Sequence, residues 1–203
     1  LEQQQQDADV FVQHFRATPP DWIIVDHYGL DKTWHASVKP LNSKLLVIDD
    51  LINRPLLCDI LINQNMVTMD DTPYKDLIEN IKCQYLVGPK YALLRPEVYE
   101  LAHKERVVHN ENKQVCVFLG YIDPDNVTQK VISGLLRLNP KVSIHLILNP
   151  LHPNYEALLQ QALEHSNITV YTKFVELIGL FNKCDLVVGA GGGASWERCC
   201  LGI

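Results

Sequence analysis

The chain has 203 residues, of which 47% are hydrophobic and 21% are charged, a composition typical of a globular protein with one large or two small domains. Its formal net charge of −6, without clustered Lys or Arg, argues against nucleic-acid and membrane-surface partners. No apolar run is long enough to cross a bilayer and no signal-peptide pattern opens the sequence, so we expect a cytoplasmic protein.

The first half of the chain alternates apolar strands with helices. Helices are predicted over residues 7–17, with Asp7 as the cap, and near residues 32–38. Apolar runs predict strands at DWIIVDHY (21–28), KLLVIDD (44–50), CDILINQN (58–65) and QYLVG (84–88). In PKYALLRPEV, prolines bracket a loop and open a helix near Pro96.

The second half repeats this alternation after a polar stretch, residues 103–113, which is the best candidate linker. Strands are predicted at QVCVFLG (114–120), VSIHLIL (142–148), ITVYT (168–172) and residues 185–188. Helices are predicted over residues 124–138, with Asp123 as cap and Pro124 as first helical residue, over 154–165, and near 175–182.

This pattern predicts an α/β fold with two Rossmann-like units, 1–108 and 109–203, each a parallel sheet covered by helices on both faces. The chain begins with Leu1 rather than Met and stops after Ile203, where a parallel sheet would take its next strand, so we expect a fragment truncated at both ends.

The cysteines and histidines do not show the spacing of zinc ligands, and we expect neither a metal ion nor a cofactor. Buried free thiols in a reducing compartment are the expected state of the six cysteines, which are Cys58, Cys83, Cys116, Cys184, Cys199 and Cys200.

Polar residues that directly follow a strand are the candidates for function, because ligands of open parallel sheets bind beyond the carboxyl ends of the strands. The sequence places Asp26, His27 and Tyr28 at one such end. Each alone is more consistent with capping or packing, but the three together favour a site. The adjacent carboxylates Asp49 and Asp50 are interpreted as loop caps or structural partners, since neighbours after a strand point to opposite sides.

The stretch VVGAGGGASWERCC is a strand, a glycine turn over residues 189–193, and a helix that begins at Ala194. Such a turn lets the backbone approach a ligand and presents unpaired N–H groups to an anion, although a plain strand-to-helix connection explains it equally well. A second turn at Gly120 repeats the pattern, and two such turns fit a diphosphate. Glu197 would accept hydrogen bonds from ribose hydroxyls. Without a Walker pattern, and with its glycine turn late in the domain, the chain is not expected to be an ATPase or a nicotinamide dehydrogenase.

Six motifs occur in register along nearly the whole chain: DWIIVDHYGLD, VIDDL, CDILINQN, KYALLRPEV, DPDNVT and GAGGGASWERCCLGI. Together they resemble the UDP-sugar hydrolases of pseudaminic acid biosynthesis, bacterial relatives of the glycosyltransferases with two Rossmann-like domains of glycosyltransferase-B type. The resemblance implies hydrolysis of UDP-2,4-diacetamido-2,4,6-trideoxy-β-L-altrose to UDP and free sugar, by attack of water at the anomeric carbon.

The resemblance also implies roles for particular residues. Tyr28 and His27 would be catalytic, with Tyr28 facing the reacting end across a cleft between the domains. Glu197 would lie on the ribose side, and Arg95 would support the cleft. The full set of implied substrate-binding residues is Arg95, Gly120, Asp123, Asn126, Gly191, Gly192, Gly193, Ser195 and Glu197.

Two departures from the family pattern matter. The glycine-rich GxGH motif that carries the family's catalytic base is absent, so the main base is not in this chain, and FLGY replaces the usual FGG. We therefore expect weak UDP binding and poor catalysis. Two alternatives stay open, a UDP-sugar-dependent glycosyltransferase of the same architecture and a non-catalytic nucleotide-sugar-binding fragment.

Overall fold

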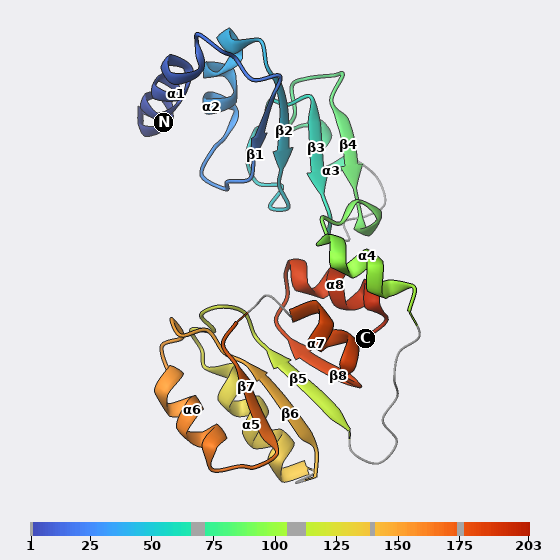
Figure 1. Ribbon diagram of the computed structural model, residues 1–203. Helices are drawn as coiled ribbons and strands as arrows, with labels where there is room; N and C mark the ends of the chain where they lie inside the picture. Colours follow the sequence, from blue (N-terminus) through green and yellow to red (C-terminus); the bar gives the residue numbers. More distant parts are fainter. Residues whose placement is uncertain (1, 66–71, 105–112, 139–140, 174–176) are drawn as a thin grey trace. The chain divides into compact units, whose positions relative to one another are not determined.

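The computed structural model describes residues 2–65, 72–104, 113–138, 141–173 and 177–203 (Figure 1). Contacts between Cα atoms separate two compact units, Leu1–Leu93 and Leu94–Ile203, whereas the sequence predicted a boundary at residue 108. Helix α4 (Pro96–Ala102) joins unit 2 because it packs against α7 and α8. Most of the predicted linker, residues 105–112, lies outside the described residues.

Unit 1 holds a four-stranded parallel sheet in the order β1-β2-β3-β4. Its elements are α1 (Glu2–Phe15), β1 (Trp22–Val25), α2 (Lys32–Ser37), η1 (Lys39–Leu41), β2 (Lys44–Ile48), β3 (Ile60–Asn63), α3 (Thr72–Lys75), β4 (Gln84–Val87) and η2 (Pro89–Tyr91). The four strands match the four predicted ones, while α3 was not predicted.

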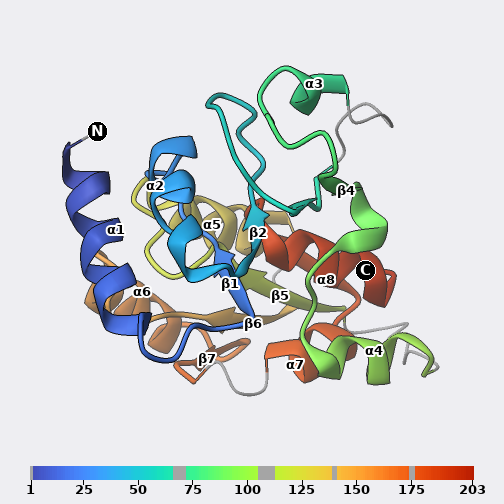
Figure 2. The same cartoon turned by 90° about the horizontal axis from the view of Figure 1, so that it is seen from above.

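Helices cover one face of the unit 1 sheet. Helices α1 and α2 lie side by side in both views (Figures 1 and 2), and Ala8 and Trp34 pack with Val25 and Val47 of the strands. The other face is covered unevenly, since Ile24 of the edge strand β1 is 66% exposed whereas Ile62 of β3 is 8% exposed. The strand order favours helices on the first face, because successive crossovers of one hand between neighbouring strands all fall on one side of a sheet.

Helix α1 begins five residues earlier than predicted, at Glu2. The glutamines before Asp7 are good helix formers, so they continue the helix toward the amino terminus. Asp7 therefore does not cap α1. Its carboxylate accepts a hydrogen bond of 2.7 Å from the indole Nε1 of Trp34, which ties α1 to α2.

Unit 2 holds a second four-stranded parallel sheet in the order β7-β6-β5-β8. Its elements are α4 (Pro96–Ala102), β5 (Gln114–Phe118), α5 (Val127–Leu138), β6 (Ser143–Ile147), α6 (Tyr155–Leu163), β7 (Ile168–Tyr171), α7 (Leu177–Lys183), β8 (Leu186–Gly189) and α8 (Gly193–Leu201). The parallel pairing of β5 with β6 was predicted and is confirmed. The start of the helix predicted near 175–182 lies outside the described residues.

Unit 2 buries both faces of its sheet. Val117 and Leu146 pack with Ile132 of α5 on one face, and Cys116 packs with Phe181 of α7 on the other. The strand order reverses between β5 and β8, which sends the connecting helices to opposite faces. This reversal is a topological switch point, where ligands of open α/β sheets usually bind. No helix among the described residues has the length and apolar character needed to cross a membrane.

Candidate functional site

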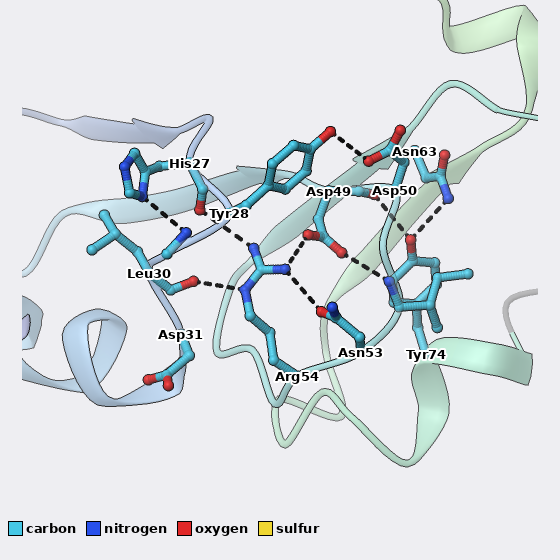
Figure 3. Close-up of polar contacts among 12 residues, drawn as sticks. His27, Tyr28, Leu30, Asp31, Asp49, Asp50, Asn53, Arg54, Asn63 and Tyr74 are labelled. Carbon is cyan, nitrogen blue, oxygen red and sulfur yellow. Dashed lines mark hydrogen bonds and ion pairs between the residues drawn. The ribbon is translucent and has the colours of Figure 1, made fainter. Parts of the chain in front are cut away.

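In unit 1, a cluster of polar side chains lies where the strands end (Figure 3). The hydroxyl of Tyr28, after β1, donates a 2.8 Å hydrogen bond to Asp50, after β2, and the Asn65 amide donates to the other Asp50 oxygen at 2.7 Å. The hydrogen bond to Asp50 and then burial raise the pKa of Tyr28 above its usual value of 10.0. Because this pKa is raised, the phenol keeps its proton and is suited to donating a hydrogen bond rather than to acting as a base. Tyr28 is 56% exposed, so a ligand can reach it.

His27 occupies the same strand end with its imidazole exposed. Its Nδ1 accepts a hydrogen bond of 3.0 Å from the backbone N–H of Gly29, so the neutral ring carries its proton on Nε2. The ring folds so closely over Gly29 that a Cβ there would lie 2.8 Å from His27 Cε1. In this arrangement His27 presents a donor to solvent.

Asp49 has a structural role, in line with its interpretation from the sequence. Its carboxylate is buried and pairs with Arg54, with 2.6 Å between Oδ2 and Nη1 (Figure 3). Arg54 also donates to the carbonyl oxygen of Leu30 at 2.9 Å, and the Tyr74 hydroxyl donates to the Asp49 carbonyl at 2.9 Å. These contacts hold the loops after β1 and β2 in place. Sequence reasoning missed Arg54 and Tyr74, because neither adjoins a strand end.

In unit 2, two predicted turns emerge side by side at the switch point. Phe118 of β5 pairs with Gly189 of β8, so the loops that follow these residues are neighbours. Gly120 and Gly192 have φ values of 93° and 100°, in the region that favours glycine. Gly192 is the N-cap residue of α8, and no side chain at this position accepts a hydrogen bond from the first N–H groups of the helix. Gly189 and Gly193, predicted as turn, belong to β8 and α8 instead.

The structure brings two predicted site residues into direct contact. Arg95 Nε and Nη2 donate to the two carboxylate oxygens of Glu197, at 2.7 Å each. The Glu197 side chain is 9% exposed and that of Arg95 is 41% exposed. A bidentate pair of this kind is short, strong and geometrically fixed. It joins the start of α4 to α8 and neutralises the carboxylate one turn after the glycines.

Arg198 is a residue at this turn that sequence reasoning missed. Its Nη2 donates to the carbonyl oxygen of Ala190 at 2.9 Å and to Ser195 Oγ at 3.0 Å. The guanidinium lies so close to Gly189 that a Cβ there would be 2.4 Å from Nη1. Nη1 is buried without a hydrogen-bond partner in the described structure, and the charge of Arg198 is not paired with a carboxylate there. The positively charged guanidinium of Arg198 therefore lies next to Gly189 and Ala190, where the glycine turn begins.

The loop between β5 and α5 is shaped by Asp123 and Asn126, whose φ values of 40° and 48° are unusual for residues other than glycine. They delay the predicted helix, so α5 begins at Val127 and Pro124 is not helical. The Asp123 carboxylate accepts from the N–H groups of Val127, at 3.1 Å, and Thr128, at 2.7 Å. Asp123 therefore caps a helix, as predicted, but that helix begins at Val127 rather than at Pro124.

Asp123 also faces a second loop. His152, which is buried, places Nε2 3.6 Å from Asp123 Oδ2. Burial raises the pKa of Asp123, but the hydrogen bonds from Thr128 and Val127 outweigh it and lower the value overall. The Asn126 amide donates to Gln129 at 2.8 Å, and its buried Oδ1 finds no partner within the described ranges. Among the residues that the structure describes, His, Cys, Asp and Glu do not gather into a metal-binding group.

No family model matches the sequence. An uncharacterized protein of Methanocaldococcus jannaschii is 26% identical over 203 residues, which covers 97% of this chain and 42% of that protein. A UDP-2,4-diacetamido-2,4,6-trideoxy-beta-L-altropyranose hydrolase of Campylobacter jejuni is 29% identical over 168 residues, which covers 82% of this chain and 58% of the hydrolase. The chain spans about half the length of these relatives.

Two further proteins extend the comparison. A spore coat polysaccharide biosynthesis protein of Bacillus subtilis is 22% identical over 57% of the chain. Among solved structures, a mutant O-GlcNAc transferase of Thermobaculum terrenum matches 97% of this chain and 39% of its own, with a TM-score of 0.50 and 14% identity. The sequence is thus distantly similar to a UDP-sugar hydrolase, and the fold is α/β with two four-stranded parallel sheets of glycosyltransferase-B type.

Proposed function

We propose that the protein is a UDP-sugar hydrolase that binds the nucleotide of its substrate at the switch point of unit 2. The observation that carries this proposal is the pairing of β5 with β8, which sets the Gly120 loop beside the turn that opens α8. Backbone N–H groups at a helix start favour an anion, and a diphosphate supplies one. The distant similarity to a UDP-sugar hydrolase supports uridine diphosphate as that group.

The charges around the turn fit an anionic ligand. Arg95 neutralises Glu197, so this carboxylate does not repel a diphosphate, and Arg198 leaves one uncompensated positive charge beneath the turn. Glu197 keeps lone pairs outside its bonds to Arg95, and these would accept hydrogen bonds from the ribose hydroxyls. Ser195 Oγ accepts a hydrogen bond from Arg198 and donates its proton to the carbonyl oxygen of Ala190 at 3.3 Å, a bond that it would exchange for one to a phosphate oxygen when the nucleotide binds. Asn126 in the neighbouring loop would contact the nucleotide sugar.

For the reaction we propose hydrolysis of a UDP-linked diacetamido-trideoxy sugar to UDP and the free sugar, as in pseudaminic acid biosynthesis. Tyr28 would orient water or substrate, because its hydroxyl is exposed and its raised pKa makes it a poor base. His27 would donate a hydrogen bond through Nε2. The glycine-flanked His of the resembling family has no counterpart here, so the main base is not assigned within this chain.

Calorimetry with UDP tests the nucleotide site. Replacing Glu197 by Ala should weaken UDP binding by about 1 to 3 kcal/mol, the range for losing hydrogen bonds to a charged group. Glu164→Ala is the matched control, because it removes the same charge from an exposed position at the end of α6. UDP affinity that is the same in both variants would remove Glu197 from the site.

The double variant Arg95→Met/Glu197→Ala separates a ribose contact from the loss of the ion pair. If Glu197 touches the ribose, the double variant binds UDP as weakly as Glu197→Ala does. If only the unpaired Arg95 disturbs the site, the double variant recovers wild-type affinity. Release of UDP without an acceptor, measured on the full-length natural protein, tests hydrolysis, and release only with an acceptor would instead indicate a glycosyltransferase.

A further inference from the structure

Two thiols of unit 1 face each other near the amino ends of neighbouring strands. Cys58 lies two residues before β3 and Cys83 lies immediately before β4. Their Sγ atoms are 3.6 Å apart, within hydrogen-bond distance for sulfur, and the two residues are 2% and 8% exposed. The proposed nucleotide site uses neither residue.

The contact makes the two thiols chemically unequal. The hydrogen bond from Cys58 lowers the pKa of Cys83 against the opposing effect of burial, and a hydrogen bond from the backbone of Leu61 lowers it further. The same contact raises the pKa of Cys58. Cys83 is also the more exposed residue of the two, at 8% against 2%, and because the thiolate is the nucleophilic form of cysteine we expect Cys83 to react first.

A cavity of about 600 Å³ in unit 1 has Cys58 in its wall, and the Sγ atom of Cys83 lies 3.6 Å from that of Cys58. His35, Leu45, Asp59 and Asn80 also line the cavity. Hydrogen peroxide is similar in size to water, so it fits this space easily. A small oxidant in the cavity would therefore lie next to Cys58 and within one thiol contact of Cys83, whereas both residues are buried from large reagents.

We propose that Cys58 and Cys83 form an oxidisable dithiol, a modification site at which a hydroperoxide converts the two thiols into a disulfide. The Cys83 thiolate attacks one peroxide oxygen, the O–O bond breaks, and the hydroxide that leaves takes up a proton to become water. Cys83 is then a sulfenic acid. Cys58 sulfur attacks Cys83 sulfur, the S–S bond forms, the S–O bond breaks, and the departing hydroxide takes the Cys58 proton. The two sulfurs are oxidised and the peroxide is reduced to two waters.

Unit 2 supplies a matched internal control. Cys116 and Cys184 also form a thiol–thiol hydrogen bond, but both side chains are 0% exposed. The hydrogen bond with Cys184 and then burial raise the pKa of Cys116. The second pair therefore has the proximity of the first without its access to solvent.

The test is treatment of the folded chain with hydrogen peroxide, followed by thiol alkylation, digestion and mass spectrometry. The experiment uses the Cys199→Ser/Cys200→Ser background, since Cys199 is exposed and Cys200 half-buried. A Cys58–Cys83 disulfide should form at least about tenfold faster than a Cys116–Cys184 disulfide, because oxidation follows thiolate character and exposure. Dithiothreitol should reverse it.

A second arm tests the order of the steps. In Cys58→Ser the sulfenic acid on Cys83 should persist and react with dimedone, whereas Cys83→Ser should leave Cys58 largely unlabelled. Circular dichroism confirms that each variant is folded. The proposal is wrong if folded wild-type protein forms no Cys58–Cys83 link at peroxide concentrations that fully oxidise Cys199, or if both buried pairs cross-link at the same rate.

Discussion

Tyr28 is the residue for which packing and catalysis predict different results. Its hydroxyl contacts Asp50 at an exposed strand end, so its removal should cost at most about 1 kcal/mol of stability. If Tyr28 acts mainly in the transition state, Tyr28→Phe lowers turnover of the full-length protein by about tenfold to a few hundredfold and leaves UDP affinity unchanged. Steady-state kinetics measures the turnover, and calorimetry measures the UDP affinity. Unchanged turnover, or loss of the fold, would favour a packing role.

Arg54 gives a prediction about stability at the same scale. Its partner Asp49 has a side chain only 1% exposed, so Arg54→Met leaves a buried carboxylate without its cation. We expect the free energy of unfolding to fall by about 3 kcal/mol in urea titration. The control is Lys32→Met, which breaks a pair with Glu79 whose side chains are 41% and 59% exposed. An exposed pair contributes about 0.5 kcal/mol or less, so equal losses in the two variants would contradict the assignment.

At the scale of elements, Asp123 determines where α5 begins. Asn tolerates the same backbone conformation but cannot accept with two carboxylate oxygens, so Asp123→Asn should lower stability at neutral pH by about 1 kcal/mol. Asp125→Asn, an exposed neighbour in the same loop, is the control and should be neutral. Urea titration gives the free energy of unfolding of both variants. Similar losses of stability in the two would contradict a specific capping role for Asp123.

The stability that Asp123 contributes depends on pH. Its pKa is lowered in the folded protein, so the unfolded chain holds a proton more tightly at this residue. The contribution is complete above the unfolded pKa of about 4 and is lost as the pH falls through the folded value. The difference in free energy of unfolding between the wild type and Asp123→Asn should therefore become smaller as the pH falls. If this difference in free energy of unfolding instead grew below about pH 4, the lowered pKa of Asp123 would be wrong in direction.

At the scale of the whole molecule, each unit has its own hydrophobic core. Hydrogen exchange in urea should therefore resolve two cooperative units that divide near Leu93. UDP at a hundredfold excess over Kd should raise the protection of unit 2 by about 2.7 kcal/mol and leave unit 1 unchanged. A single transition for all amides, or protection of unit 1 alone, would contradict this expectation.

The amino-acid sequence by itself determined the fold class and the candidate strand ends. Apolar runs separated by helices are typical of strands buried in a parallel sheet, and the eight strands in the described part of the chain lie where such runs occur. The glycines after β8 likewise indicate a turn from composition alone, because few other residues adopt that backbone. Asp123 was recognisable as a cap, since carboxylates in that position accept from a helix start.

Tertiary structure decided which of these positions come together. Periodicity shows that a strand is buried but not beside which strand it lies, so the reversal between β5 and β8 and the exposure of Ile24 on the edge strand β1 were not predictable. The pair of Arg95 and Glu197 joins residues 102 positions apart, and local pattern carries no signal for such a contact. The later start of α5 depends on the left-handed Asn126, whose backbone N–H donates to the carbonyl oxygen of Asp123 at 2.9 Å.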